Sequence, residues 1–164
     1  MRKTVISILA VIIAVTANAQ SHSNSIGIGA GATYKCGLEG NIFWEHETRY
    51  HNAWEFFANG FTMWDKDSDS LFKGYNSLSI GTAWKPCVYR AKNNYGSIRI
   101  GASVGSDLDK VLAGLHAGYE HNYALPHGWK FYWQAKVDIT LPNSGNLLRG
   151  GFAVGIKFPS LNIN

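Results

Sequence analysis

Charged residues are scarce in this sequence. Only 16% of its 164 residues are Asp, Glu, Lys or Arg, whereas a soluble domain usually carries about a quarter. The formal net charge is +4, and the Lys and Arg residues are not gathered into the basic cluster that a nucleic-acid interface requires. We therefore expect no direct binding of nucleic acid.

Long apolar runs and linkers are also missing from most of the chain. After Val15, no segment is apolar enough to form a helix through a bilayer. No Pro-, Ser- or Gln-rich stretch divides the remainder, and the whole chain has only four prolines. These absences argue against transmembrane helices and against several domains. They predict a single domain over residues 20–164.

The first residues are the exception. A basic start is followed by an apolar run over Val5–Val15, which is too short to span a bilayer, and then by small residues at Ala17 and Ala19. This order is typical of a cleavable secretory signal peptide, here residues 1–19. A lipoprotein signal would need a cysteine directly after the cut, whereas the first cysteine is Cys36. Removal of the peptide takes away two of the 15 Lys and Arg residues, which leaves 13 against 11 acidic residues and a net charge of +2.

Aromatic residues and glycine, by contrast, are abundant. The chain has six tryptophans and 18 glycines, and 46% of its residues are hydrophobic. Little charge combined with many rings is poorly tolerated by a protein surface in water. The same composition is well tolerated in contact with lipid, so we expect a membrane protein that crosses with strands.

Apolar and polar residues alternate along most of the chain. Between residues 128 and 141, for example, Trp129, Phe131 and Trp133 alternate with polar neighbours. A period of two is typical of a β-strand with one apolar and one polar face. Turn-rich breaks separate segments of about ten residues, the length that a tilted transmembrane strand requires. The predicted strands cover residues 25–34, 38–48, 52–64, 77–84, 97–104, 111–122, 128–141 and 148–158.

These strands predict an all-β fold, an eight-stranded antiparallel up-and-down outer-membrane β-barrel. The alternative is a soluble cup with its apolar face inside. Eight strands enclose an interior only wide enough for side chains, and the large rings of the apolar face would not all fit there. We therefore assign rings to the lipid-facing surface and its aromatic belts. These are Trp54, Trp84, Tyr119, Trp129, Phe131, Trp133, Phe152 and Phe158.

The polar face carries small residues and charges of both signs. Unpaired ions removed from water cost several kcal/mol each, whereas paired ions cost much less. We therefore predict a lumen that is filled by paired charges and that conducts poorly. The predicted network consists of Glu39, Glu45, Glu55, Arg99, His116, Glu120, Lys130, Lys136, Asp138, Arg149 and Lys157.

Candidate catalytic and metal-binding residues form no recognisable motif. The six histidines show no ligand spacing, and the acidic segment over residues 65–70 lacks the glycine and the distal glutamate of a calcium loop. Ser103, His116 and Asp138 supply the residue types of a nucleophile, a base and an orienting acid, but no Gly-x-Ser-x-Gly elbow accompanies them. We expect no metal, no cofactor and no enzymatic activity.

The predicted strand order places the two cysteines and the loops at particular ends of the barrel. Cys36 falls in a turn at one end of the predicted barrel and Cys87 in a turn at the other, about 25 Å apart. A disulfide needs Cα atoms within about 7 Å, so we expect two free thiols. The outward loop over residues 65–74 and an unusually long inner loop over residues 86–95, with Lys85, Arg90 and Lys92 near the start of the next strand, are candidate partner surfaces.

Several ordered blocks of the sequence are similar to a known family. The blocks are Ala53–Ala58, Trp84–Val88, Arg99–Ser103, Gly105–Asp107, Leu115–Leu125 and Gly128–Trp129. They resemble the TraO conjugative transposon proteins of Bacteroidetes, and the likeness runs from Ser25 to Phe158. The resemblance implies a part in the type IV-like machinery that moves an integrative element between cells, and it implies no catalytic residues.

Taken together, the pattern and the resemblance favour a non-catalytic component of a conjugative transfer apparatus. It is expected in the outer membrane of a Gram-negative bacterium, in contact with outer-membrane lipid and with other proteins of the apparatus. The alternative is a small pore or a carrier for a small molecule, with Arg99, Glu120 and Lys136 along its path. A third possibility, an enzymatic barrel, ranks below both.

Overall fold

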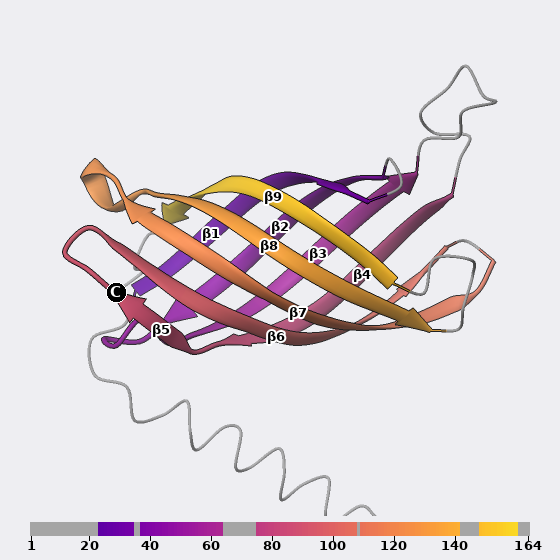
Figure 1. Cartoon of the computed structure of the whole chain (residues 1–164), viewed down its shortest axis with the longest axis horizontal. Coiled ribbons are helices and arrows are strands. Elements are labelled where there is room, and N and C mark those ends of the chain that lie inside the picture. The colour runs from indigo at the N-terminus through magenta and orange to yellow at the C-terminus, as the bar shows by residue number, and fades with distance from the viewer. Residues whose placement is uncertain (1–22, 35–36, 64–74, 108, 142–147, 161–164) are drawn as a thin grey trace, which may run out of the picture.

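The computed structural model describes residues 23–34, 37–63, 75–107, 109–141 and 148–160, and the predicted signal peptide lies outside this part of the chain. Most of the described residues form strands (Figure 1). The elements are β1 (Ser23–Thr33), β2 (Gly37–Glu47), β3 (Ala53–Met63), β4 (Asn76–Lys85), β5 (Cys87–Arg90), β6 (Asn94–Ser106), β7 (Val111–Ala124), a 3-10 turn η1 (Pro126–Gly128), β8 (Lys130–Leu141) and β9 (Leu148–Pro159). No helix among the described residues has the length and hydropathy needed to cross a membrane.

The strands close into an antiparallel barrel. Their order around the wall is β4-β3-β2-β1-β9-β8-β7-β6-β5, and a further pairing of β4 with β6 closes the cylinder. β5 is only four residues long and pairs with β6 where β4 ends. Because β4 and β5 together occupy one strand position in the wall, the barrel is eight-stranded. The predicted fold, an eight-stranded antiparallel up-and-down barrel, is confirmed.

Pro86 explains the division between β4 and β5. A proline has no N–H to donate and therefore interrupts a ladder of hydrogen bonds. The interruption is local, because the Pro86 carbonyl still accepts a hydrogen bond of 3.0 Å from the N–H of Ile98. Pairing resumes at Cys87, opposite Ser97.

The long inner loop predicted over residues 86–95 is therefore wrong. Most of it belongs to β5 and β6, and a tight turn closed by the hydrogen bond from Ala91 N to Asn94 O (2.8 Å) remains. The predicted strand start at residue 128 is also wrong, because His127 (φ 63°) and Gly128 (φ 79°) adopt left-handed backbone conformations in η1. β8 begins only at Lys130.

The two ends of the barrel differ. The start of β1 and the end of β9 lie together at one end, since Ser25 pairs with Pro159. The short connections β2–β3, β5–β6 and β7–β8 lie there as well (Figure 1), and we call this the short-turn end. The opposite end, the loop end, carries the short β1–β2 and β6–β7 connections together with the longer β3–β4 and β8–β9 connections. In outer-membrane barrels, short turns face the periplasm and longer loops face outward.

Alternation places apolar residues outside and polar residues inside. Phe56, Ile100 and Phe152 on the outer face are 55%, 53% and 51% exposed, whereas the inward Tyr132 is 0% exposed. Glycine makes room for the inward rings: a Cβ atom on Gly27 would lie 2.1 Å from the ring of Phe43. The wall is thus apolar toward its surroundings and packed toward its axis.

Candidate functional site in the barrel lumen

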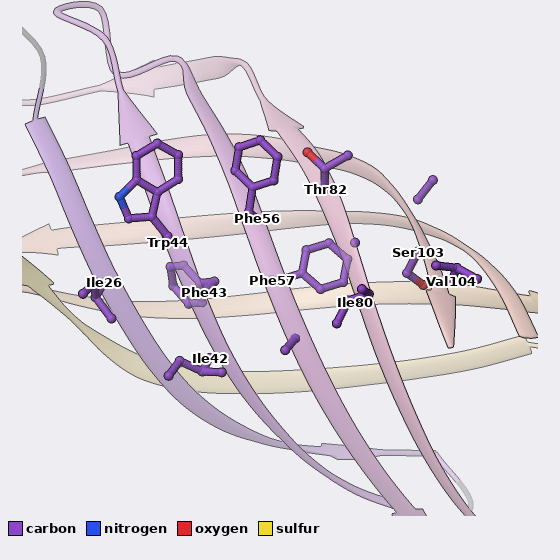
Figure 2. A pocket seen from close by; sticks show the side chains of 13 residues that line it. Ile26, Ile42, Phe43, Trp44, Phe56, Phe57, Ile80, Thr82, Ser103 and Val104 are labelled. Carbon is purple, nitrogen blue, oxygen red and sulfur yellow. The ribbon is translucent and has the colours of Figure 1, made fainter. Parts of the chain in front are cut away.

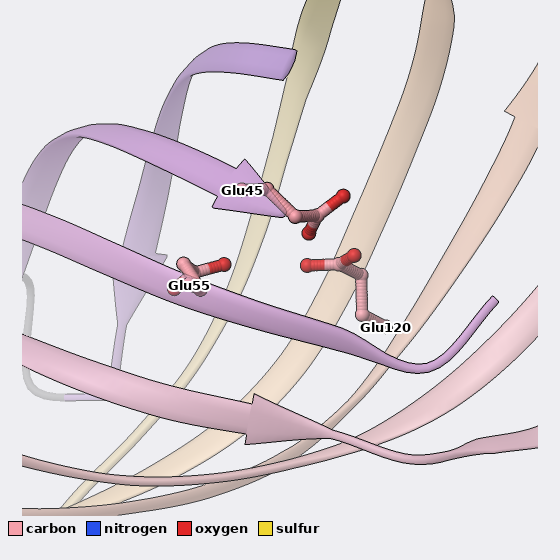
Figure 3. A group of neighbouring side chains, drawn as sticks. All are labelled: Glu45, Glu55 and Glu120. Atoms are coloured by element: carbon pink, nitrogen blue, oxygen red, sulfur yellow. The ribbon is translucent and has the colours of Figure 1, made fainter. Parts of the chain in front are cut away.

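Three carboxylates converge inside the barrel near the short-turn end. Glu45 on β2, Glu55 on β3 and Glu120 on β7 point toward one another (Figure 3). Their ligand oxygens lie within 4.8 Å of one another, and each residue is buried. Three carboxylates this close need counter-charges, because uncompensated buried ions are strongly destabilising.

Two lysines and an arginine supply these counter-charges. Lys85 Nζ lies 2.6 Å from Glu45, 2.5 Å from Glu55 and 2.7 Å from Glu120. Lys157 Nζ lies 2.8 Å from Glu45 and 2.7 Å from Glu120. Arg99 donates to Glu55 from Nε at 3.0 Å and from Nη2 at 2.7 Å. We call these six residues the short-turn cluster, and its formal charges cancel.

The short-turn cluster could hold a divalent cation only if the lysines left. Its three carboxylates form the acidic group that the described residues offer for a metal ion. The ammonium groups of Lys85 and Lys157, however, already contact these oxygens, and each lysine is 1% exposed. The chemistry of the donor set therefore favours internal ion pairs over a metal centre.

A smaller group closes the short-turn end. Glu47 accepts a hydrogen bond of 2.6 Å from the Tyr95 hydroxyl and pairs with Lys130 Nζ at 2.5 Å. Its other oxygen lies 2.5 Å from His51 Nδ1, and the His51 ring stacks on Tyr95 with centroids 4.2 Å apart. These contacts cover the short-turn cluster from the side of the turns.

Aromatic rings fill the middle of the lumen. Phe43 and Tyr132 meet edge to face with centroids 5.6 Å apart, and the Arg99 guanidinium lies 4.5 Å from the centre of the Phe57 ring. The Tyr132 hydroxyl donates to Asn41 Oδ1 at 3.1 Å. This aromatic layer separates the short-turn cluster from the polar groups beyond it.

A second polar group lies on the loop side of the aromatic layer. Lys136 pairs with Glu39 and lies 3.0 Å from Asp138. His116 Nδ1 is 2.7 Å from Asp138 Oδ1, and His116 Nε2 is 2.7 Å from Ser103 Oγ. We call these five residues the loop-end cluster. Its spatial pairing of Ser103 with His116 and Asp138 is not visible as a sequence motif.

Arg149 lies closest to the loop end. Its guanidinium carbon is 4.1 Å from the centre of the Phe61 ring and 5.4 Å from that of Tyr75. Nη1 donates to Ser77 Oγ at 3.4 Å. The Nε and Nη2 atoms are buried without a hydrogen-bond partner within the described part of the chain.

The structure places all residues of the predicted charge network inside the barrel. Most are buried, while Lys130 and Arg149 near the two ends are half-buried. Two members are absent from the prediction, Glu47 and Lys85. Lys85 is not beside a loop: it is the last residue of β4 and shares the inward parity of Ala83. Extending the predicted strand over residues 77–84 by one residue, as far as the residue before Pro86, would have placed Lys85 in the lumen.

The predicted lipid-facing rings all lie on the outer face. Trp84, Trp129, Phe131 and Phe152 are exposed, whereas the others are partly covered by neighbouring rings. Trp133, for example, lies 5.5 Å from Tyr119 and stacks on Phe152 at 5.8 Å, between ring centroids. These contacts form an aromatic band over β7, β8 and β9.

An apolar groove of about 840 Å³ marks the outer face of β1–β4 and β6. Figure 2 shows Trp44, Phe56 and Thr82 next to one another on adjacent strands along it. Ile26, Ile42, Ile80 and Val104 contribute to its apolar lining. Such a lining suits hydrocarbon chains and offers few groups that could orient a polar ligand.

At the loop end, Asp107 stabilises the turn between β6 and β7. Its Oδ1 accepts hydrogen bonds from the N–H groups of Lys110 (2.8 Å) and Asp109 (3.2 Å). The hydrogen bond from Lys110 lowers the pKa of the Asp107 carboxyl. The charged carboxylate therefore favours the tight turn.

Cys87 is a free, half-buried thiol, and its Sγ lies 3.2 Å from the Tyr89 carbonyl oxygen. Cys36 lies outside the described residues. Its described neighbours Thr33 and Gly37 pair with each other at the loop end, whereas Cys87 belongs to the short-turn half.

Comparisons with known proteins identify the architecture. No family model and no curated protein matches the sequence. Among solved structures, the chain is similar to a major outer membrane protein from Thermus thermophilus, with a TM-score of 0.55 and 11% identity over 86% of this chain and 100% of that one. It is also similar to a de novo designed transmembrane β-barrel, with a TM-score of 0.51 and 11% identity over 84% of this chain and 95% of that one. At this identity the likeness shows the fold, an outer-membrane-type barrel.

Proposed function

We propose that this chain is a structural component of a conjugative transfer apparatus, held as a plugged barrel in the outer membrane of a Gram-negative bacterium. The signal peptide over residues 1–19 brings it across the inner membrane. The short-turn end then faces the periplasm and the loop end faces outward. The observation that carries the proposal is an apolar outer wall around a lumen filled by paired ions.

The blocks that resemble the conjugative transposon family support this role. The Ala53–Ala58 block lies in β3 and supplies Glu55, and the Arg99–Ser103 block lies in β6. The Leu115–Leu125 block spans most of β7 and supplies His116 and Glu120. The resemblance is thus carried by segments that also build the two ionic clusters.

The filled lumen favours a structural role over a pore or a carrier. In a pore, Arg99, Glu120 and Lys136 would line an open path. Here each of them is at most 6% exposed and is held in an ion pair. We expect the purified protein to be silent in planar bilayers, and steady channels of appreciable size would favour the pore.

Other proteins of the apparatus are the proposed partners, and the short-turn end offers a surface for them. Arg90 donates to the Tyr50 carbonyl at 2.5 Å, and both residues are exposed beside Tyr89. This arginine and its tyrosine neighbours are suited to a periplasmic protein partner, because Arg and Tyr are enriched at protein interfaces.

A transfer assay tests the proposal. An in-frame deletion of the gene in a donor strain should abolish transfer of the element, and the wild-type gene supplied in trans should restore it. Arg90→Ala should lower the transfer frequency while the barrel still reaches the outer membrane. Lys92→Ala, at an exposed position on the same turn, is the matched control. Unchanged transfer after deletion would refute the role in conjugation.

A further inference from the structure

Ser103, His116 and Asp138 form a continuous hydrogen-bonded relay across three neighbouring strands. They lie on β6, β7 and β8, and His116 is directly opposite Asp138 in the ladder. The Ser103 Oγ to His116 Nε2 and His116 Nδ1 to Asp138 Oδ1 distances are both 2.7 Å. A hydroxyl within reach of an imidazole that is oriented by a carboxylate is the signature of an activated nucleophile, and it is recognised by geometry on unrelated folds.

The orientation of the imidazole follows from its partners. A carboxylate only accepts hydrogen bonds, and Lys136 at 3.0 Å helps to keep Asp138 in this form. Nδ1 therefore carries the hydrogen toward Asp138, which leaves Nε2 free to accept the proton of the Ser103 hydroxyl. This is the tautomer that a general base requires.

The relay borders a cavity of about 30 Å³. Since one water needs roughly 10–15 Å³ measured in this way, the cavity holds about two waters or a group the size of an acetyl. On the side of the aromatic layer, the Phe57 ring packs edge to face against His116, which lines the cavity, at 5.2 Å between ring centroids. Its lining extends toward the loop end through Gly105 and Thr140, so an incoming molecule would approach from there.

Arg149 provides the remaining element of a reactive site. It lines the same cavity as Ser103 and His116. Its buried Nε and Nη2 donors find no acceptor within the described part of the chain, an arrangement that costs stability unless a ligand or a water uses them. Preorganised donors of this kind stabilise the oxyanion of an acyl-transfer intermediate.

From this geometry we propose that the loop-end half of the lumen hydrolyses short-chain esters, with Ser103 as the nucleophile. Ser103 Oγ attacks the ester carbonyl carbon while His116 Nε2 takes the hydroxyl proton, and Arg149 faces the developing oxyanion. His116 returns this proton to the departing alcohol, which leaves an acetyl or formyl group on Ser103. A water molecule, deprotonated by His116, then releases the carboxylic acid and restores the serine. This activity is additional to the structural role proposed above.

Acylation of the folded chain tests the proposal. The mature protein, refolded in detergent micelles, is incubated with p-nitrophenyl acetate, and release of nitrophenol is followed together with intact mass and peptide mapping. We expect turnover, with an acetyl group on Ser103 at early times. Ser103→Ala and His116→Gln should each lower the rate by about a hundredfold or more, the contribution of a general base.

Two controls keep the result interpretable. Ser97→Ala removes a hydroxyl on the same strand as Ser103 but outside the cavity lining, and it should leave the rate unchanged. Heat-modified migration on gels shows that each variant still folds as a barrel. Absence of acetylation in the folded wild type, acetylation only at lysines, or an unchanged rate in folded Ser103→Ala would each overturn the proposal. None of these outcomes bears on the transfer assay.

Discussion

The two halves of the lumen accommodate buried polar and charged side chains in different ways. In the short-turn cluster, three carboxylates meet three cations and the largest fully buried side chains are packed together. In the loop-end half, smaller polar groups surround a cavity of about 30 Å³, and Arg149 keeps unpartnered donors within the described part of the chain. The short-turn half is therefore packed as a plug. The loop-end half retains the free space and the free donors that binding or chemistry requires.

The largest effect should come from removing one charge of the plug. Lys85→Met leaves three buried carboxylates to two cations, and we expect a loss of about 3–5 kcal/mol in the free energy of unfolding. Lys136→Met should cost less, about 1–3 kcal/mol, because water in the neighbouring cavity can solvate Glu39 and Asp138. Urea unfolding in lipid vesicles, followed by tryptophan fluorescence, measures both. Lys92→Met on the exposed turn is the control, and equal losses in the two halves would break the comparison.

Both halves are enclosed by one lipid-facing wall, and a charge on that wall should have the next largest effect. Ile100 lies at the middle of β6 and is 53% exposed. Ile100→Arg should cost about 2–4 kcal/mol at mid-depth in a bilayer, whereas Tyr123→Arg near the short-turn end should cost about 0–1 kcal/mol. The same unfolding assay applies. Equal, small losses at both positions would indicate a surface in water.

A smaller effect should follow from overfilling the plug. A Cβ atom on Gly27 would lie 2.1 Å from the Phe43 ring, which is itself buried, so Gly27→Ala should destabilise by about 1–3 kcal/mol. The outward Gly40 on β2 has nothing within 4 Å of its Cβ position. Gly40→Ala should stay within about 0.5 kcal/mol. A neutral Gly27→Ala would show that the plug is loosely packed.

Alternation explains why so much of the wall could be predicted. A period of two assigns each residue to a face without knowledge of its partners, and it places Glu120 inside and Trp133 outside. The prediction fails around Pro86. A proline is usually interpreted as a turn, although here it removes only one hydrogen bond from the ladder. Interpreting Pro86 as a turn places Lys85 next to a loop, whereas the structure places it at the end of β4.

The pairing of the charges could not be predicted in the same way. Lys157 contacts Glu120 and Lys136 contacts Glu39, pairs that are separated by 37 and 97 residues in sequence. These contacts depend on the register and tilt of strands around the closed cylinder. The relay of Ser103, His116 and Asp138 depends on the same register, and no short sequence motif indicates that register.

The most direct test concerns which face of the wall meets lipid. All tryptophans of the described residues lie on the outer face: Trp44, Trp54, Trp84, Trp129 and Trp133. The inward rings are those of phenylalanine, tyrosine and histidine, such as Phe43, Tyr132 and His116. The mature chain reconstituted in vesicles of lipids brominated along the acyl chains should therefore lose most of its tryptophan fluorescence, while aqueous iodide has little effect. Strong quenching by iodide together with none by brominated lipid would contradict a membrane barrel with its ions inside.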